Sequence, residues 1–119
     1  MLSAIAKNLH IPTIERHIFL CADQTKPKCC DRDLSIGIWE YLKQRIQDLN
    51  LETKVFRTKA NCLRLCQAGP IMVVYPDKVW YHSIDQQAID RILVEHIIGN
   101  QIVKDYVIYA PDSCMIYSL

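Results

Sequence analysis

The sequence predicts an α/β fold in which a four-stranded mixed sheet is flanked by two main helices. Three observations support this expectation. The chain has 119 residues, a length that suits a single domain. Half of its residues are hydrophobic and 23% are charged, as in globular proteins. Short apolar runs of strand length also alternate with segments of helical periodicity.

The first half of the chain is predicted to form a strand, a helix and a second strand. Residues 17–21 are an apolar run of strand length, and residues 22–33 are polar and read as a loop. Apolar side chains then recur at helical spacing at Ile38, Leu42, Ile46 and Leu49, with Asp33 or Ser35 as the expected N-cap. Residues 51–57 alternate in polarity until Phe56, which predicts the second strand.

The second half is predicted to form a hairpin and a helix. Residues 71–75 are apolar on both faces, as in a central strand, and a turn at 76–78 leads to a partner strand at 79–81. Residues 83–86 match a capping box. One helical face follows until Gly99, and it consists of Ile89, Ile92, Leu93, His96 and Ile97. On that face His96 is expected to be a hydrogen-bonded structural residue.

A right-handed crossover makes the first two strands parallel, and the hairpin adds two antiparallel strands. This is the arrangement of a minimal thioredoxin-like core. We expect it to occupy residues 16–108, with an N-terminal arm at 1–15 and a C-terminal tail at 109–119. In this topology the end of strand 17–21 and the start of strand 71–75 lie at the same edge of the sheet.

Cysteine is the most informative residue type, because six occur in this small chain. They are Cys21, Cys29, Cys30, Cys62, Cys66 and Cys114. Residues 1–6 lack the pattern of a secretory leader, and no run approaches the ~20 apolar residues that span a bilayer. These features favour a cytoplasmic protein that does not enter a membrane. In a reducing compartment, clustered cysteines indicate metal binding or redox chemistry.

Charge and glycine content argue against two other classes of function. Fourteen basic residues against thirteen acidic residues give a net charge of +1, so no broad cationic face for nucleic acid is expected. The three glycines, Gly37, Gly69 and Gly99, are too few and too far apart for a phosphate-binding loop.

The predicted topology brings four thiols to one edge of the sheet. Cys21 and the pair Cys29 and Cys30 follow the first strand, whereas Cys62 and Cys66 precede the strand at 71–75. Their spacings differ from the C-x2-C pairs of zinc knuckles and favour an iron–sulfur cluster, with zinc left open. The pair Gly69 and Pro70 is expected to form a tight turn that frees backbone N–H groups to face sulfur.

Several stretches of the chain resemble the thioredoxin-like [2Fe-2S] ferredoxins, also called the Shethna type. They are residues 17–21, 59–70 and 73–81, together with the pair Glu95 and His96, within a match over residues 16–103. The resemblance implies an electron carrier rather than an enzyme, with redox partner proteins and a homodimeric state. It implies one [2Fe-2S] cluster on four cysteines: Cys21, Cys29, Cys62 and Cys66, with Cys30 as the alternative to Cys29.

Two other functions are compatible with the same scaffold. A thiol–disulfide oxidoreductase would use its cysteines directly, but the chain lacks the expected C-x2-C pair at the first helix. A zinc-stabilised interaction module would use the four thiols to hold the fold together.

Overall fold

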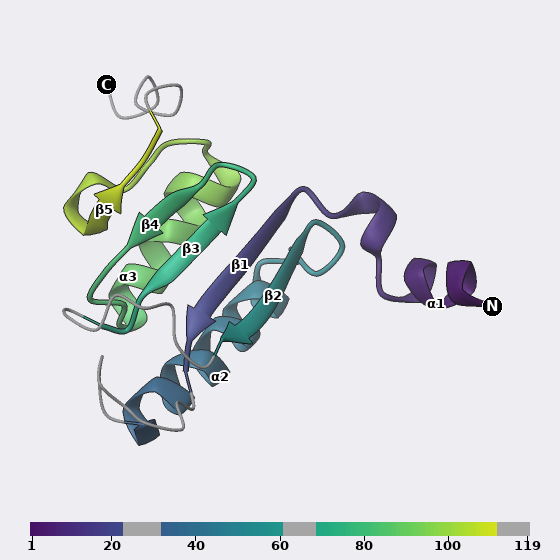
Figure 1. Ribbon diagram of the computed structural model, residues 1–119, viewed down its shortest axis with the longest axis horizontal. Helices are drawn as coiled ribbons and strands as arrows, with labels where there is room; N and C mark the ends of the chain where they lie inside the picture. Colours follow the sequence, from purple (N-terminus) through teal and green to yellow (C-terminus); the bar gives the residue numbers. More distant parts are fainter. Residues whose placement is uncertain (23–31, 61–68, 112–119) are drawn as a thin grey trace.

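The computed structural model describes residues 1–22, 32–60 and 69–111, and its centre is a five-stranded mixed sheet (Figure 1). The strands lie in the order β2-β1-β3-β4-β5. The β1–β2 pair is parallel and the other three pairs are antiparallel, as predicted for the first four strands. Their bounds are β1 Arg16–Cys21, β2 Val55–Ala60, β3 Met72–Tyr75, β4 Val79–Tyr81 and β5 Val107–Tyr109.

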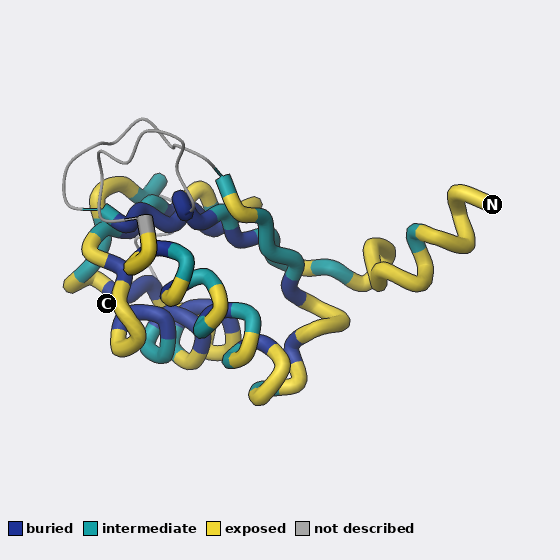
Figure 2. Tube along the Cα trace, turned by 90° about the horizontal axis from the view of Figure 1, so that it is seen from below, coloured by how far each residue is buried: buried dark blue, intermediate teal, exposed yellow. Residues whose placement is uncertain are grey.

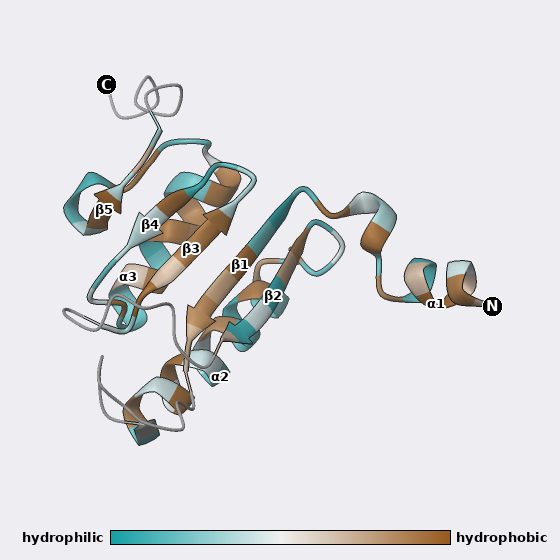
Figure 3. Ribbon diagram, in the orientation of Figure 1, coloured by the Kyte–Doolittle hydropathy of each residue, from teal (hydrophilic) through white to brown (hydrophobic). Residues whose placement is uncertain are grey.

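The two main helical segments cover one face of this sheet (Figure 2). They are α2 Arg32–Asp48, and α3 Gln86–Arg91 with its continuation as the π-helix η2 Ile92–Ile98. Alternate strand residues such as Ile18 and Leu20 belong to a single buried cluster with side chains of both helices. The central strands β1 and β3 are largely hydrophobic (Figure 3). The helical periodicity therefore identified the core-facing sides of both helices.

The prediction of four strands was wrong by one, because β5 adds a fifth strand beside β4. Tyr81 pairs with Val107, and the His82 N–H donates to the Tyr106 carbonyl at 2.8 Å. β5 is short and lies at the edge of the sheet, where side chains need not follow a buried pattern. It also runs across the boundary predicted between residues 108 and 109.

The second strand begins later than predicted. Residues 51–54 form a turn, and β2 spans Val55–Ala60. Asn50 has a positive φ of 56° after α2, and the Leu51 N–H donates back to the Ile46 carbonyl at 3.0 Å. Leu51 and Val55 are both buried by this turn. The alternation of apolar and polar residues at 51–55, which predicted a strand, therefore reflects the burial of Leu51 and Val55 by the turn.

Both predicted helix caps were wrong, although the helices themselves were predicted correctly. Asp33 and Ser35 lie inside α2, which begins at Arg32. For α3 the cap is Asp85 rather than Ser83, because the Asp85 carboxylate accepts from the Ala88 N–H at 2.8 Å. Gly99 follows η2 as predicted.

The predicted N-terminal arm consists of the helix α1 Leu2–Asn8 and the 3-10 turn η1 Ile11–Thr13. Neither element contains a buried residue, and α1 projects away from the sheet (Figure 1). Within the described ranges no helix is long and apolar enough to cross a membrane.

His96 is buried in a hydrogen-bonded network, as the sequence predicted. Its Nδ1 lies 2.7 Å from the Tyr81 hydroxyl, and its Nε2 lies 2.6 Å from Asp77 Oδ2. The Val103 N–H donates to the Tyr81 oxygen at 3.2 Å, and Arg16 Nε donates to Asp77 at 2.9 Å. When neutral His96 carries its proton on Nε2, the Tyr81 hydroxyl donates to Nδ1 and Nε2–H donates to Asp77. This tautomer of neutral His96 pairs both ring nitrogens, one with Tyr81 and one with Asp77.

This network predicts a loss of stability in mild acid. Burial lowers the pKa of His96 below its usual value of 6.5, although the hydrogen bond to Asp77 acts in the opposite direction. The unfolded chain therefore binds the extra proton first, so stability falls as pH drops below 6.5, with a slope of up to about 1.4 kcal/mol per pH unit. Urea unfolding between pH 7.5 and 5 measures the slope. His96→Gln should reduce this slope and leave the part that comes from His17, whose pKa is also lowered by burial. A wild-type slope in that variant would contradict the assignment, and His10→Gln, in the exposed arm, is the control.

Candidate metal centre

The carboxyl end of β1 is the point at which three strands meet. Cys21, the last residue of β1, pairs in register with Ala60 at the end of β2. The Cys21 N–H donates to the Ile71 carbonyl at 3.0 Å, just before β3 begins, and the Ala22 N–H donates to the Ala60 carbonyl at 2.9 Å. The structure therefore confirms that the end of the first strand and the start of the third share one edge.

The Cys21 thiol is placed as a metal ligand would be. Its side chain is fully buried, and the Ile71 N–H donates to Cys21 Sγ at 3.0 Å. A backbone N–H directed at sulfur stabilises the thiolate, which is the form that binds metal. The sequence predicted N–H groups facing sulfur after Gly69 and Pro70, and Ile71 supplies one. Its acceptor, Cys21, became apparent only from the pairing of β1 with β3.

The segments that carry the other candidate ligands start or end at this edge. Residues 61–68 follow Ala60, which pairs with Cys21, and precede Gly69, two positions before Ile71. Residues 23–31 follow Ala22 directly and precede α2. The predictions for Cys29, Cys30, Cys62, Cys66 and Cys114 concern positions outside the described residues.

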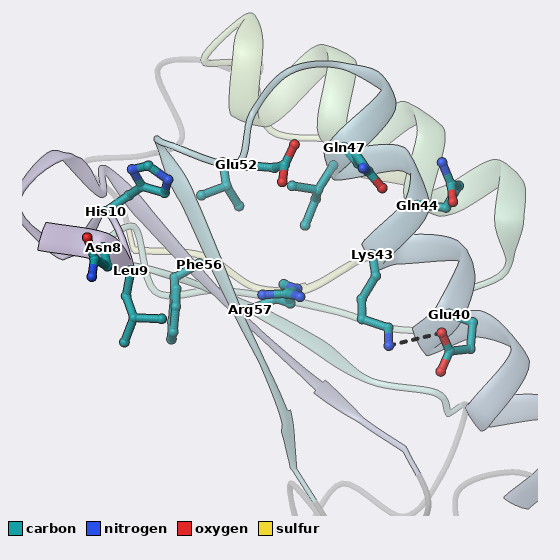
Figure 4. A pocket seen from close by; sticks show the side chains of 12 residues that line it. Asn8, Leu9, His10, Glu40, Lys43, Gln44, Gln47, Glu52, Phe56 and Arg57 are labelled. Atoms are coloured by element: carbon teal, nitrogen blue, oxygen red, sulfur yellow. Dashed lines mark ion pairs between the residues drawn. The ribbon is translucent and has the colours of Figure 1, made fainter. Parts of the chain in front are cut away.

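Other features of the described residues lie away from this edge. His96 and Asp77 belong to the network at the opposite end of β1, where Arg16 begins the strand. A polar cleft between the arm, α2 and the first half of β2 is lined by side chains of both charges, with an ion pair of 3.0 Å between Lys43 and Glu40 (Figure 4). Among residues 1–22, 32–60 and 69–111, no three potential metal ligands gather.

Comparison with known proteins identifies the family. The 2Fe-2S ferredoxin of Aquifex aeolicus (strain VF5) is 31% identical over 99 residues, which cover 78% of this chain and 88% of that protein. This chain belongs to the thioredoxin-like [2Fe-2S] ferredoxins. A 2Fe-2S ferredoxin of Clostridium pasteurianum is 29% identical over 94 residues, covering 76% of this chain and 92% of that ferredoxin. No protein-family model matches the chain.

The fold agrees with a solved structure of a ferredoxin from the same family. The crystal structure of the wild-type thioredoxin-like [2Fe-2S] ferredoxin from Aquifex aeolicus superposes with a TM-score of 0.70. It is 28% identical in sequence, and the match covers 81% of this chain and 98% of that one.

Membership in these ferredoxins confirms three expectations from the sequence. The fold is thioredoxin-like, the function is electron transfer rather than enzymatic catalysis, and the cofactor is a [2Fe-2S] cluster. Neither the thiol–disulfide oxidoreductase nor the zinc-stabilised module is favoured by these relatives. The buried Cys21 thiol with its N–H donor fits the thiolate chemistry that such a cluster requires.

Proposed function

We propose that this ferredoxin carries one electron at a time on a single cluster held by Cys21, Cys29, Cys62 and Cys66. The observation that carries the proposal is the Cys21 thiol, fully buried at the edge where β1, β2 and β3 meet, with a backbone N–H 3.0 Å from its sulfur. Cys30 is the alternative to Cys29, since the two are adjacent in the sequence.

Covalent geometry supports the proposed ligand set. A chain extends at most ~3.6 Å per residue. Cys62 is two residues beyond Ala60, so it can be no more than ~7 Å from a residue that pairs with Cys21. Cys66 is three residues before Gly69, which limits it to ~11 Å from Gly69, and Gly69 lies two positions before Ile71, whose N–H faces Cys21 Sγ. Both thiols are therefore within range of a cluster beside Cys21.

Among the described residues, Cys21 and Ile71 form one side of this site, where a buried sulfur faces a backbone N–H. A [2Fe-2S] cluster supplies one-electron redox chemistry when it is bound. Cys21 is held in place by the hydrogen bond from its N–H to the Ile71 carbonyl, by its pairing with Ala60 and by burial. The Ile71 N–H directs positive charge at that sulfur and offsets negative charge gained on reduction. Ile71 thereby favours the reduced state without a charged side chain.

The proposed partners are redox proteins that dock near this edge and a second copy of the chain. Electron transfer requires proximity, so the edge that carries Cys21 is the expected contact point. A net charge of +1 gives little long-range steering, and docking would depend on local charges. We also propose a cytoplasmic location, on the basis of the cysteine content.

The proposal is tested by analysis of anaerobically purified full-length protein. Iron and acid-labile sulfide should each reach two per chain, with visible absorbance that bleaches on one-electron reduction. After reduction with dithionite, the protein should give the electron paramagnetic resonance signal of one unpaired electron per cluster. A colourless chain loaded with zinc would refute the proposal, as would a protein without labile sulfide that reduces insulin disulfides.

A further inference from the structure

The polar cleft between the N-terminal arm, α2 and β2 has the size of a site for a small molecule. Its volume is about 570 Å³, and pockets that bind small molecules have volumes of roughly 300 to 1,000 Å³. One side is formed by residues 8–10 of the arm, which lies outside the stretch 16–103 that resembles the ferredoxins. The cleft is therefore separate from the features that define the family.

Arg57 directs its side chain into this cleft. It pairs in register with Ile18, whose side chain is buried beneath the helices, so Arg57 also points to the helical side of the sheet. Figure 4 shows its side chain between those of Phe56 and Lys43. Arg57 is only partly exposed, and a charge that is partly shielded from water interacts more strongly with an opposite charge than one in open solvent does.

The guanidinium of Arg57 differs from those of three other arginines in having no carboxylate partner. Arg16, Arg45 and Arg91 each donate from Nε to a carboxylate, at 2.9, 2.8 and 2.8 Å respectively. Within residues 1–22, 32–60 and 69–111, Arg57 belongs to no ion pair. A guanidinium presents planar donors that match the two oxygens of a carboxylate. Arg57 is therefore available to the carboxylate of a ligand.

The cleft also contains a carboxylate without a cationic partner. Glu52 lies in the exposed turn before β2, and it forms no ion pair with Arg57 or with any other described residue. Lys43 and Glu40 neutralise each other at 3.0 Å. Two opposite charges are thus left over, at Arg57 and at Glu52. Glu52 would repel a simple anion, whereas a molecule that carries both charges complements the pair.

The remaining surface of the cleft suits an aliphatic group. Ile46 and Val55 are buried at its base, and Leu9 reaches it from the arm with 48% of its surface exposed. An aliphatic side chain placed against Leu9 would remove apolar surface of both partners from water. The cleft therefore combines two separated charges with an apolar surface.

We propose that this cleft binds a small zwitterion of the amino-acid class, either a free aliphatic amino acid or a short peptide that contains one. The carboxylate of the ligand pairs with Arg57, its ammonium group pairs with Glu52, and its side chain packs on Leu9. This binding function goes beyond electron transfer. The cleft lies at the first half of β2, whereas Ala60, at the end of β2, pairs with Cys21 at the metal edge.

Nuclear magnetic resonance titration of the isotope-labelled, oxidised, full-length ferredoxin tests the proposal. L-leucine or L-leucyl-L-leucine should shift the amide signals of residues 8–10, 43–47 and 55–57 until the shifts saturate. The probe that saturates at the lower concentration identifies the source as a free amino acid or a peptide. Isocaproate lacks the ammonium group of leucine and isoamylamine lacks its carboxylate, so each should bind about tenfold more weakly than leucine or worse.

Substitutions of the two charged residues test the proposed contacts. Arg57→Gln and Glu52→Gln should each raise the dissociation constant of the better probe about tenfold or more, because each removes one charged contact. Lys54→Gln is the matched control, since Lys54 is exposed in the same turn but does not line the cleft. It should bind as the wild type does. Circular dichroism should show the same fold in all three variants.

Three results would overturn the proposal. Neither probe would give saturable shifts at the cleft, or isocaproate or inorganic phosphate would bind as tightly as the better probe, which would indicate a site for simple anions. In the third, Lys54→Gln would weaken binding as much as Arg57→Gln, which would indicate a response to net charge alone. Iron and sulfide are measured on the same samples. A failure of the ferredoxin proposal would lower the metal content, whereas a failure of this one would leave it at two per chain.

Discussion

Replacing Cys21 with alanine should abolish assembly of the [2Fe-2S] cluster. The variant removes one of the four proposed thiolates, and the methyl group of alanine cannot bind iron. Iron and labile sulfide should fall from two per chain to near zero, and the visible absorbance should disappear. Metal analysis and absorption spectroscopy of anaerobically purified protein measure this loss.

The matched control is Cys114→Ala, because Cys114 is the cysteine that is neither in the proposed ligand set nor its alternative. It should retain wild-type iron, sulfide and absorbance. Circular dichroism should show that Cys21→Ala keeps its sheet and helices, since the substitution removes one small side-chain atom from β1. A Cys21→Ala protein with full iron and sulfide would contradict the role of Cys21 as a ligand.

Cys29→Ser and Cys30→Ser should differ sharply in the properties of the cluster. If Cys29 is the second ligand, its replacement substitutes a harder oxygen for a thiolate sulfur, which weakens binding to iron. Cys29→Ser should therefore lose most of its cluster or show shifted g-values after reduction by dithionite. Cys30→Ser should retain the wild-type spectrum and metal content. Electron paramagnetic resonance of the two variants, prepared in parallel, measures the difference.

The two variants serve as controls for each other, because their positions are adjacent and the substitution is the same. The opposite pattern would transfer the ligand to Cys30. Wild-type spectra from both variants would show that either thiol can serve, and would contradict a unique second ligand. The double variant should lose the cluster in every case.

The sequence predicted the first four strands and both main helices because each has a strong local pattern. The core-facing stripe of α2 and the continuous apolar run of β3 both came from side-chain periodicity. The errors fell where the pattern was weak or ambiguous. Leu51 and Val55 are buried by a turn as effectively as by a strand, and β5 is a three-residue edge strand held by its pairing with β4.

The candidate metal centre was likewise predicted only in part from the sequence. Cysteine spacing and strand order were enough to predict that Cys21 would lie beside the start of the third strand. They could not identify the N–H group that faces its sulfur, because this contact joins residues fifty positions apart. The buried links from Tyr81 through His96 to Asp77 were likewise unpredictable in detail, since a helical stripe specifies burial and not the partners of a side chain.

The sequence by itself determined the type of cofactor and the broad fold of this chain. Both depend on local properties, namely the chemistry of the thiols and the periodicity of the apolar side chains. The sheet face opposite the helices is different. His17, Phe19, Phe56 and Tyr75 are scattered over some sixty residues, and nothing local distinguishes them from core residues. They form one surface only when the register of β2, β1 and β3 aligns them and both helices pack on the other side. Which apolar residues lie away from the helices is decided by which sheet face the helices cover, and that choice exists only in three dimensions.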